Sequence, residues 1–446
     1  MREKSKKQLP LMNPTIDHPQ ARELEEIDLI LEKNATIIDL VHQDLCRGRN
    51  LRDTGANGLS AEHVLRAAIV KQMFGFSYEL LPFHLADSNS LRRFCRLGIA
   101  DKCFKKSALA KNIKRISGTT WEQINRILVV HGRQTEVEKG RQVRIDCTVV
   151  ESNIHPPSDS TLLFDCVRVL VRILDGIRQV GVSVVFTDHC RRAKRRMLAV
   201  QYAKKEKQRL AAYRDLLKMA ENTVGYAQVA IPLVERLAGL EAMAFEAELK
   251  HYIDLTGQVI EQTERRVLKG EKVPASEKIV SIFEPHTDII VKDRRETYYG
   301  HKVCLCVGAS NLITDCLITE GNPADSELTL KMLDRQNDLY GRYPLKVALD
   351  GGFASKDNLA AAKKRQIKDV CFSKKRGLEV EQMCRSQWVF NRLRRFRAGV
   401  ESIISWIKRS LGFDRCTWKG QDSFASYVWL SAVTANLMTL ARAKTV

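Results

Sequence analysis

The stretch KVALDGGFAS, residues 346–355, joins a short run of strand-forming residues to one acid and two glycines. Asp350 follows the apolar run directly, and Gly351 and Gly352 leave the next two positions without side chains. A carboxylate at the C-terminal end of a strand, beside glycines that allow a ligand to come close, is a common way for α/β proteins to build a site. The stretch therefore predicts an α/β fold with a functional acid at one edge of its sheet.

A second strand that carries an acid lies far upstream. In RQVRIDCTVV, residues 141–150, apolar and polar residues alternate, and Asp146 occupies one of the polar positions. This period of two predicts a strand. Further strands are predicted at 299–308, 312–320 and 370–375, with helices between and after them. The order of these elements predicts a mixed five-stranded sheet flanked by helices.

Helical patterns fill the rest of the chain and suggest how it divides into domains. Residues 1–55 read as a lead-in with one helix, and residues 56–140 carry the signals of short helices, as in a helix-turn-helix DNA-binding domain. Residues 164–279 are predicted to be a helical insertion between the first two strands of a core formed by 141–163 and 280–446. The cations of the helical domain expected to meet phosphates are Arg92, Arg93, Arg96, Lys111, Lys114 and Arg115. A solvated helical bundle is the alternative interpretation of that domain.

The charge balance indicates what kind of partner the chain binds. Lys and Arg number 73 against 53 Asp and Glu, which gives a net charge of +20 over 446 residues. Such an excess favours a polyanion, with nucleic acid first and an anionic membrane surface second. The basic N-terminus, MREKSKKQLPLMNP, has no apolar core behind it and does not resemble a secretory signal. We therefore expect a cytoplasmic protein whose scattered cysteines are reduced and whose apolar segment 424–441 is a buried helix.

Three acids that are far apart in the sequence, Asp146, Asp350 and Glu401, can meet at one edge of such a sheet. In RRFRAGVESIISWIKRS, Arg397 and Lys408 share a helix face with Glu401, beside an apolar stripe that packs on the sheet. Three converging carboxylates repel one another and need a cation, for which Mg²⁺ or Mn²⁺ is suited. Two such ions would hold the attacking and leaving oxygens of a phosphodiester displacement. On this interpretation Gly351 and Gly352 make room for a phosphate backbone.

At these residues the chain resembles the DDE transposases of bacterial insertion sequences, and more narrowly the group called the "not classified yet" insertion-sequence family. The resemblance rests on RIDCTVVESNIHPPSDSTLLFD, SIFEPHTDIIVKDRRETYYGHKV, EGNPADSEL, VALDGGFAS and RFRAGVESIISWIKRSLGFDRCTWKG, in that order. Related families carry a Tyr-x2-Arg-x3-Glu-x6-Lys pattern, which Arg397, Glu401 and Lys408 fit, while Arg394 stands at the tyrosine position.

This resemblance implies a ribonuclease H-like core and catalytic, metal-binding roles for Asp146, Asp350 and Glu401. It implies binding to terminal repeats, divalent-metal-dependent cleavage at the element ends, and strand transfer to target DNA. Arg394, Arg397 and Lys408 would contact DNA phosphates, and the protein would act as a homo-oligomer on double-stranded DNA at the bacterial nucleoid. Two other functions remain open, namely a DNA-binding regulator without chemistry and a metal-dependent nuclease without strand transfer.

Several other residues have a structural interpretation that competes with a functional one. His286 and His301 are expected to be hydrogen-bonded structural histidines, because no further ligand stands at a suitable spacing. Trp418 is expected in the core, and Asp159 and Asp325 in turns or helix caps. The basic run at 191–196 is either a DNA-binding surface or a solvated helix face.

Overall fold

The structure is a computed structural model that describes residues 16–48, 58–98, 101–236, 239–292 and 296–444. The basic stretch MREKSKKQLPLMNP lies outside the described residues. The chain forms two compact units, one from Met1–Glu151 with Lys302–Val446, and the other from Ser152–His301. We describe each unit by itself.

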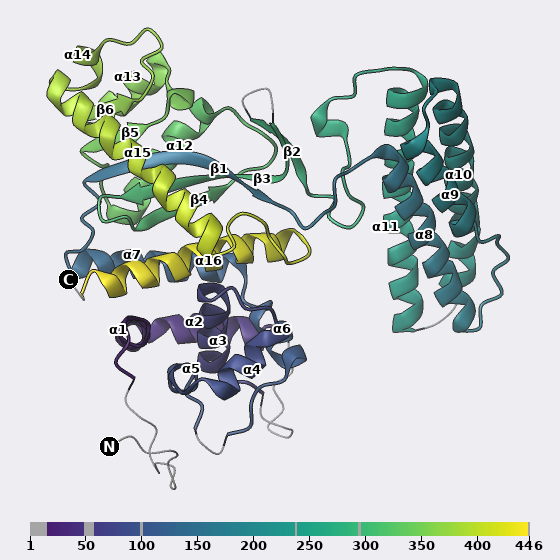
Figure 1. Cartoon of the computed structure of the whole chain (residues 1–446), viewed down its shortest axis with the longest axis horizontal. Helices are drawn as coiled ribbons and strands as arrows, with labels where there is room; N and C mark the ends of the chain where they lie inside the picture. The colour runs from purple at the N-terminus through teal and green to yellow at the C-terminus, as the bar shows by residue number, and fades with distance from the viewer. Residues whose placement is uncertain (1–15, 49–57, 99–100, 237–238, 293–295, 445–446) are drawn as a thin grey trace, which may run out of the picture. The chain divides into compact units, whose positions relative to one another are not determined.

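Seven helices open the first unit (Figure 1). They are α1 (Pro19–Lys33), α2 (Thr36–Cys46), α3 (Ala61–Met73), α4 (Leu80–Asp87), α5 (Asn89–Phe94), α6 (Lys106–Ile113) and α7 (Gly118–Gln134). Ser60 caps α3, since its side chain accepts a hydrogen bond from the His63 N–H. The single helix predicted for the lead-in is wrong, because the chain breaks into α1 and α2 at Asn34, whose side chain turns back to bond the Ile30 carbonyl.

The sheet is mixed and has six strands, one more than predicted. They are β1 (Gln142–Glu151), β2 (Asp288–Lys292), β3 (Glu296–Gly308), β4 (Ile313–Ile318), β5 (Lys346–Leu349) and β6 (Asp369–Phe372), in the order β2-β3-β1-β5-β6 with β4 also paired to β3. β2, β3 and β4 are joined by antiparallel pairings, whereas β1, β5 and β6 run parallel. The missed strand is β2, whose sequence DIIVK is too short and too uniformly apolar to show an alternation.

Helices follow the strands of the first unit and cover its sheet. They are α12 (Asp325–Tyr340), α13 (Lys356–Lys364), α14 (Val380–Met383), α15 (Gln387–Ser410) and α16 (Gln421–Arg442), with a 3₁₀ turn at Gly351–Phe353. Helix α15 contacts β1, β5 and β6, and so crosses the parallel part of the sheet (Figure 1). Its buried Phe390 and Leu393 belong to the core formed with β5 and β6.

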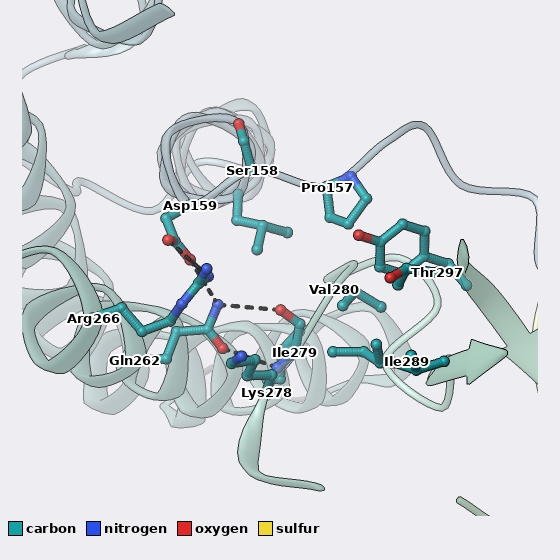
Figure 2. A pocket seen from close by; sticks show the side chains of 13 residues that line it. Pro157, Ser158, Asp159, Gln262, Arg266, Lys278, Ile279, Val280, Ile289 and Thr297 are labelled. Atoms are coloured by element: carbon teal, nitrogen blue, oxygen red, sulfur yellow. Dashed lines mark hydrogen bonds and ion pairs between the residues drawn. The ribbon is translucent and has the colours of Figure 1, made fainter. Parts of the chain in front are cut away.

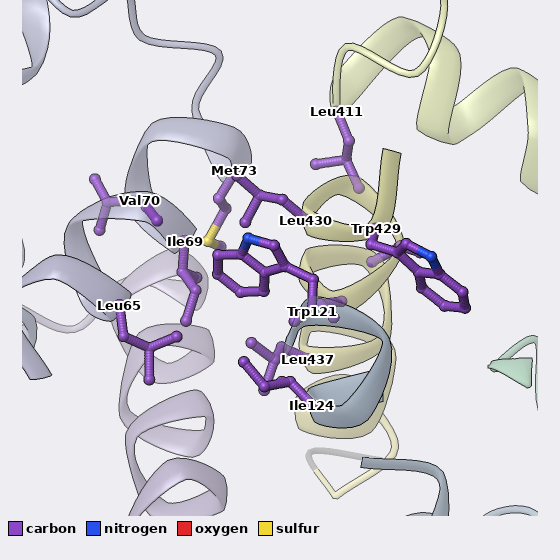
Figure 3. Close-up of a cluster of buried hydrophobic side chains, with 14 of the residues drawn as sticks. Leu65, Ile69, Val70, Met73, Trp121, Ile124, Leu411, Trp429, Leu430 and Leu437 are labelled. Atoms are coloured by element: carbon purple, nitrogen blue, oxygen red, sulfur yellow. The ribbon is translucent and has the colours of Figure 1, made fainter. Parts of the chain in front are cut away.

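The largest core of the first unit joins its N-terminal helices to its C-terminal one. Helix α16 packs against α1, α3 and α7, and Figure 3 shows the side chains that meet there. They include Leu65, Ile69 and Met73 of α3, Trp121 and Ile124 of α7, and Leu430 and Leu437 of α16. Among the described helices, α16 alone is long and apolar enough to cross a membrane, but 89% of its most apolar window is buried inside the protein. The prediction of a buried C-terminal helix is confirmed.

The second unit is a helical bundle with its own apolar core. It contains α8 (Asp159–Gln179), α9 (Cys190–Tyr202), α10 (Glu206–Glu235) and α11 (Leu240–Thr263), followed by a π turn (Glu264–Leu268) and a 3₁₀ turn (Ala275–Glu277). Helices α8 and α10 contact each other, and both α9 and α11 pack against this pair. The strand β2 and the first half of β3 complete this unit.

Candidate active site

Strand register places Asp146 beside Asp350. β1 and β5 are parallel, and Ile145 pairs with Leu349, so the acid that follows each of these residues lies at the same level of the sheet. β5 and β6 are parallel as well, with Leu349 paired to Phe372. The residues after Leu349 and Phe372 therefore share the carboxyl edge of the sheet, where open α/β sheets place their sites.

Helix α15 brings the third acid to this edge. Arg144, which projects from β1, donates from Nη1 to the Phe396 carbonyl at 2.9 Å and lies over the Phe396 ring. A side chain at Gly399 would collide with the Arg144 guanidinium, so the glycine permits this close approach. Val400, next to Gly399, and Ile407, two turns further along, are fully buried in the apolar stripe that the sequence predicted. These contacts fix the helix so that Glu401 faces the acids of β1 and β5.

The three acids converge on one guanidinium, that of Arg397. Its Nη2 lies 3.0 Å from Asp146 Oδ2 and 3.5 Å from Asp350 Oδ1, and its Nη1 lies 2.6 Å from Glu401 Oε1. The side chains of Asp146 and Arg397 are 14% and 15% exposed, whereas that of Glu401 is 63% exposed. The structure therefore brings together the three acids that the sequence singled out, and a cation of the chain itself stands between them.

The surroundings of Asp350 keep its carboxyl group ionised. Burial by itself raises its pKa, but the hydroxyl of Ser373, the N–H of Gly351 and the charges of Arg397 and Lys374 outweigh burial and lower the pKa below its usual value. The Ser373 hydroxyl donates to Asp350 Oδ1 at 2.7 Å. A carboxylate held in this way is a ready acceptor for a cation near neutral pH.

The donor set suits a hard divalent ion, although the acids are arranged around an arginine. Within the described parts of the chain, no group of three or more His, Cys, Asp or Glu side chains is spaced as a metal site. All the carboxylates of the cluster offer oxygen ligands, which Mg²⁺ and Mn²⁺ prefer. Even with Lys374 beside Asp350, the cluster holds three acids against two cations, so it retains a negative charge that attracts a divalent ion.

The two glycines after Asp350 leave space that other side chains of the protein fill. A Cβ at Gly351 would lie 2.6 Å from Cβ of Lys374, and one at Gly352 would lie 2.7 Å from Oδ2 of Asp325. The structure thus gives these glycines a role inside the protein, and their role in leaving room for a phosphate backbone stays a prediction. They are required because Lys374 and Asp325 pack against the turn, which brings a lysine to the side of Asp350.

Ser373 and Lys374 are site residues that the sequence analysis missed. Both follow β6 directly, as Asp350 follows β5, and the backbone N–H of Ser373 bonds to the Leu349 carbonyl. A signal for them was present, because polar residues after a neighbouring parallel strand meet at the same sheet edge. Asp325 also faces this turn, where it forms an ion pair with Lys302 at 3.0 Å.

The cations proposed for phosphate contacts have different surroundings. Arg394 is exposed on α15, while Lys408 is partly buried and pairs with Asp414 at 3.2 Å. In the N-terminal helices, Arg93 pairs with Glu25, and Arg96 pairs with acids of α1 and α3. Arg115 bonds to the Arg47 carbonyl and Arg92 to that of Gly98, whereas Lys111 and Lys114 are exposed. Part of the basic charge of these helices is thus balanced within the protein.

The residues with competing structural interpretations are bonded or buried. In the second unit, His286 Nδ1 and His301 Nε2 lie 2.8 Å apart, and the outer nitrogens bond to Glu284 and Asp288. Both histidines are therefore hydrogen-bonded, as predicted. Trp418 is 2% exposed and belongs to the core of the first unit, which is also as predicted.

A pocket of about 260 Å³ in the second unit lies at the start of α8 (Figure 2). Asp159 lines it and accepts hydrogen bonds from Arg266 at 2.9 Å and Gln262 at 3.3 Å. Gln262 in turn bonds the backbone of Ile279. Asp159, Arg266 and Gln262 are thus bonded within the protein, so the cluster around Arg397 is the stronger candidate site.

Comparison with known proteins agrees with this geometry. Residues 281–437, which include Asp350 and Glu401, match a family model described as a transposase DDE domain. Residues 16–115 match a second model, described as a transposase domain (DUF772). Neither the search of curated proteins nor that of solved structures found a match. Two transposase models that match separate parts of the chain, together with three converging acids, show that the chain belongs to the DDE-type transposases of insertion sequences.

Proposed function

We propose that this transposase cleaves DNA phosphodiesters at the ends of its element and joins the freed ends to target DNA. The observation that carries the proposal is the convergence of Asp146, Asp350 and Glu401 on Arg397 at the carboxyl edge of the sheet. The match to a transposase DDE domain supports the reaction class and implies a ribonuclease H-like core. The strand order, with β1 between β3 and β5, is consistent with that core.

In this proposal Asp146, Asp350 and Glu401 hold one or two Mg²⁺ or Mn²⁺ ions. When bound, such ions stabilise the charge that develops on the attacking and leaving oxygens. The chain's own residues orient the acids: Ser373 holds Asp350 by its hydroxyl, and Arg144 holds α15 so that Glu401 stays at the sheet edge. Lys374, Lys408 and Arg394 supply positive charge for the DNA backbone on either side of the acids.

The N-terminal helices at 56–140 are proposed to bind the terminal repeats, and residues 164–279 to form an insertion in the catalytic core. Support for the first assignment comes from the short, sharply turned helices α3 to α7 and from the transposase model that covers 16–115. Double-stranded DNA would be the partner, in the cytoplasm, with at least two copies of the chain acting on paired ends.

A plasmid assay tests the proposed chemistry. Supercoiled DNA that carries the cloned element ends is incubated with Mg²⁺ and wild-type protein, Asp350→Asn or Asp357→Asn. Asp357 is an exposed acid in the first turn of α13 and serves as the matched control. We expect nicked and joined products from the wild type and the control, and neither from Asp350→Asn, which should still bind the DNA.

The same assay separates the alternative functions. Nicked DNA without joined products would identify a nuclease without strand transfer. Binding without any Mg²⁺-dependent cleavage by the wild type would identify a regulator. Cleavage by Asp350→Asn at the wild-type rate would remove Asp350 from the site.

A further inference from the structure

The most strongly basic segment of the second unit runs from Asp188 to Lys218. It contains eleven Lys and Arg residues and three acids, and α9 itself contains no acid. On the inner side of α9, Ala193 and Val200 are buried in the core of the bundle. The outer side is exposed and repeats every three or four residues, through Arg191, Lys194, Arg195, Leu198 and Tyr202. This outer side is named the α9 face below.

Some of the α9 cations are used to hold the helix in place. Arg192 and Arg196 both bond to Asp215 of α10, at 2.6 Å and 2.5 Å. By contrast, no acid in the described part of the chain forms an ion pair with Arg191, Lys194 or Arg195. The helix thus divides its cations into an inward pair with an internal partner and an outward set that faces solvent.

Charge is segregated across this bundle. Helix α11, which packs on the same α8 and α10 pair as α9, carries five acids and one lysine. Its lysine, Lys250, is paired with Glu235 and Glu246. The acids of α11 do not neutralise the α9 face, so the bundle presents a basic side suited to a polyanion.

We propose that the α9 face binds the phosphate backbone of duplex DNA without reading its sequence. The proposal rests on the proposed transposase function and assigns a second DNA contact to it, apart from the three acids. Arg191 to Tyr202 spans about 16 Å of helix, a length along which duplex DNA carries about ten phosphate charges. The guanidinium group of arginine can donate two parallel hydrogen bonds to phosphate oxygens, and α9 contains no acid that would repel the phosphates.

The apolar pattern of α9 argues against a membrane as the partner. An interfacial helix turns its apolar stripe towards the lipid. Here Ala193 and Val200 point into the bundle, and the α9 face offers lipid only Leu198, which is 37% exposed, and Tyr202, which is 78% exposed. DNA backbone is the polyanion that this surface fits best.

Fluorescence anisotropy with the full chain tests this inference. The probe is a labelled 40-bp duplex of random sequence, in EDTA so that no cleavage occurs, at several salt concentrations. The test variant is Arg191→Gln/Lys194→Gln/Arg195→Gln. The control, Arg172→Gln/Lys250→Gln/Lys269→Gln, removes the same charge from the same unit but away from the α9 face. Circular dichroism checks the folding of each protein.

We expect the test variant to bind the duplex about tenfold or more weakly than the wild type, with a salt slope reduced by about 2–3. The control variant should stay within about twofold of the wild type. Equal losses in the two variants would mean that only net charge matters, and no loss in the test variant would mean that the face is not used; either result overturns the inference.

Two further measurements separate this inference from its alternatives. If the test variant loses binding to phosphatidylserine vesicles but keeps its DNA affinity, the partner is a membrane and the inference is wrong. The plasmid assay with Asp350→Asn reports on the acids alone. The α9 inference can therefore fail while the proposed chemistry stands, and a failure of that chemistry leaves the anisotropy result readable.

Discussion

Replacing Arg397 by methionine tests whether the arginine serves as the internal counter-ion of the three acids. The substitution keeps an unbranched stem of similar shape and removes the charged guanidinium group. Asp146, which is 14% exposed, would lose its ion pair with Arg397, and the carboxylates of Asp350 and Glu401 would lose the charge that separates them. We therefore expect a less stable protein in the absence of metal.

The size of the effect follows from the burial of each partner. Breaking a buried ion pair costs about 3–5 kcal/mol, whereas an exposed pair contributes about 0–1 kcal/mol. Since Asp146 is nearly buried while Asp350 and Glu401 are 35% and 63% exposed, we expect a loss of about 2–3 kcal/mol. At about 2–4 °C per kcal/mol, this lowers Tm by roughly 5–10 °C.

The loss of stability should depend on Mg²⁺ and on pH, whereas the loss from a simple packing defect would not. Mg²⁺ at about 100 times its Kd adds about 2.7 kcal/mol to the folded state. The variant should gain more from Mg²⁺ than the wild type, because no guanidinium competes for its acids. Because the folded pKa of Asp350 is lowered, its stabilising contribution is present above the unfolded pKa near 3.8 and is lost as pH falls through the folded value. The gap between variant and wild type should therefore be full at pH 7.5 and shrink below about pH 4.

The assay is thermal unfolding at pH 7.5 in EDTA and across a Mg²⁺ titration. Arg395→Met is the control, since Arg395 is an exposed arginine of the same helix. If Arg397→Met and Arg395→Met melted together in EDTA, or if Mg²⁺ stabilised both equally, the counter-ion role of Arg397 would be refuted.

Three further predictions concern the other parts of the first unit. Glu401→Gln should change stability by less than about 1 kcal/mol, because its side chain is 63% exposed, yet slow Mg²⁺-dependent plasmid cleavage about a hundredfold or more; an unchanged rate would remove Glu401 from the site. Gly351→Ala should cost about 1–3 kcal/mol in urea unfolding, because its Cβ would press on Lys374; an equally stable variant would show that the turn can relax. Burial, with the charge of Lys114 adding to it, lowers the pKa of Lys71 to about 8, so the unfolded state binds more protons between pH 8 and 10.5 and wild-type stability should rise there. Lys71→Met should flatten that rise and increase the free energy of unfolding at pH 7 by up to about 3 kcal/mol. The loss of the contact between Lys71 and the Tyr78 ring reduces this gain. A pH profile of stability that the substitution leaves unchanged would contradict the lowered pKa.

Sequence patterns predicted the parts of the fold that depend on local periodicity. The strand at Asp146 and the amphipathic helix at Glu401 show their period over several residues, and the strand at Asp350 is marked by an apolar run that ends on Asp-Gly-Gly; the structure has each of them. β2 was missed because DIIVK neither alternates nor ends in a glycine turn like the one after β5, and the break at Asn34 was missed because it depends on a side chain that bonds the backbone of its own helix.

The ion pairs between residues that are distant in the sequence could not be predicted, because they depend on the tertiary fold. A count of basic residues in the N-terminal helices includes Arg93 and Arg96, but only the fold shows that acids of α1 lie against them. The position of Arg397 between three acids likewise depends on the crossing of α15 over the sheet. Its spacing from Glu401 predicted a shared helix face, while its contacts with Asp146 and Asp350 join residues that are distant in the chain.

The packing of α16 against α3 and α7 determines when this core can form during synthesis on the ribosome. The apolar faces of α3 and α7 are synthesised before the helix that covers them, Gln421–Arg442, because the whole sheet is encoded between them. At about 5–20 residues per second, roughly 15–60 s separate the end of α7 from the end of α16. During that interval the nascent chain exposes Ile69 and Trp121, so chains that stop before α16 should depend on chaperones or aggregate, and the core around α3 and α7 is complete only once α16 has been made.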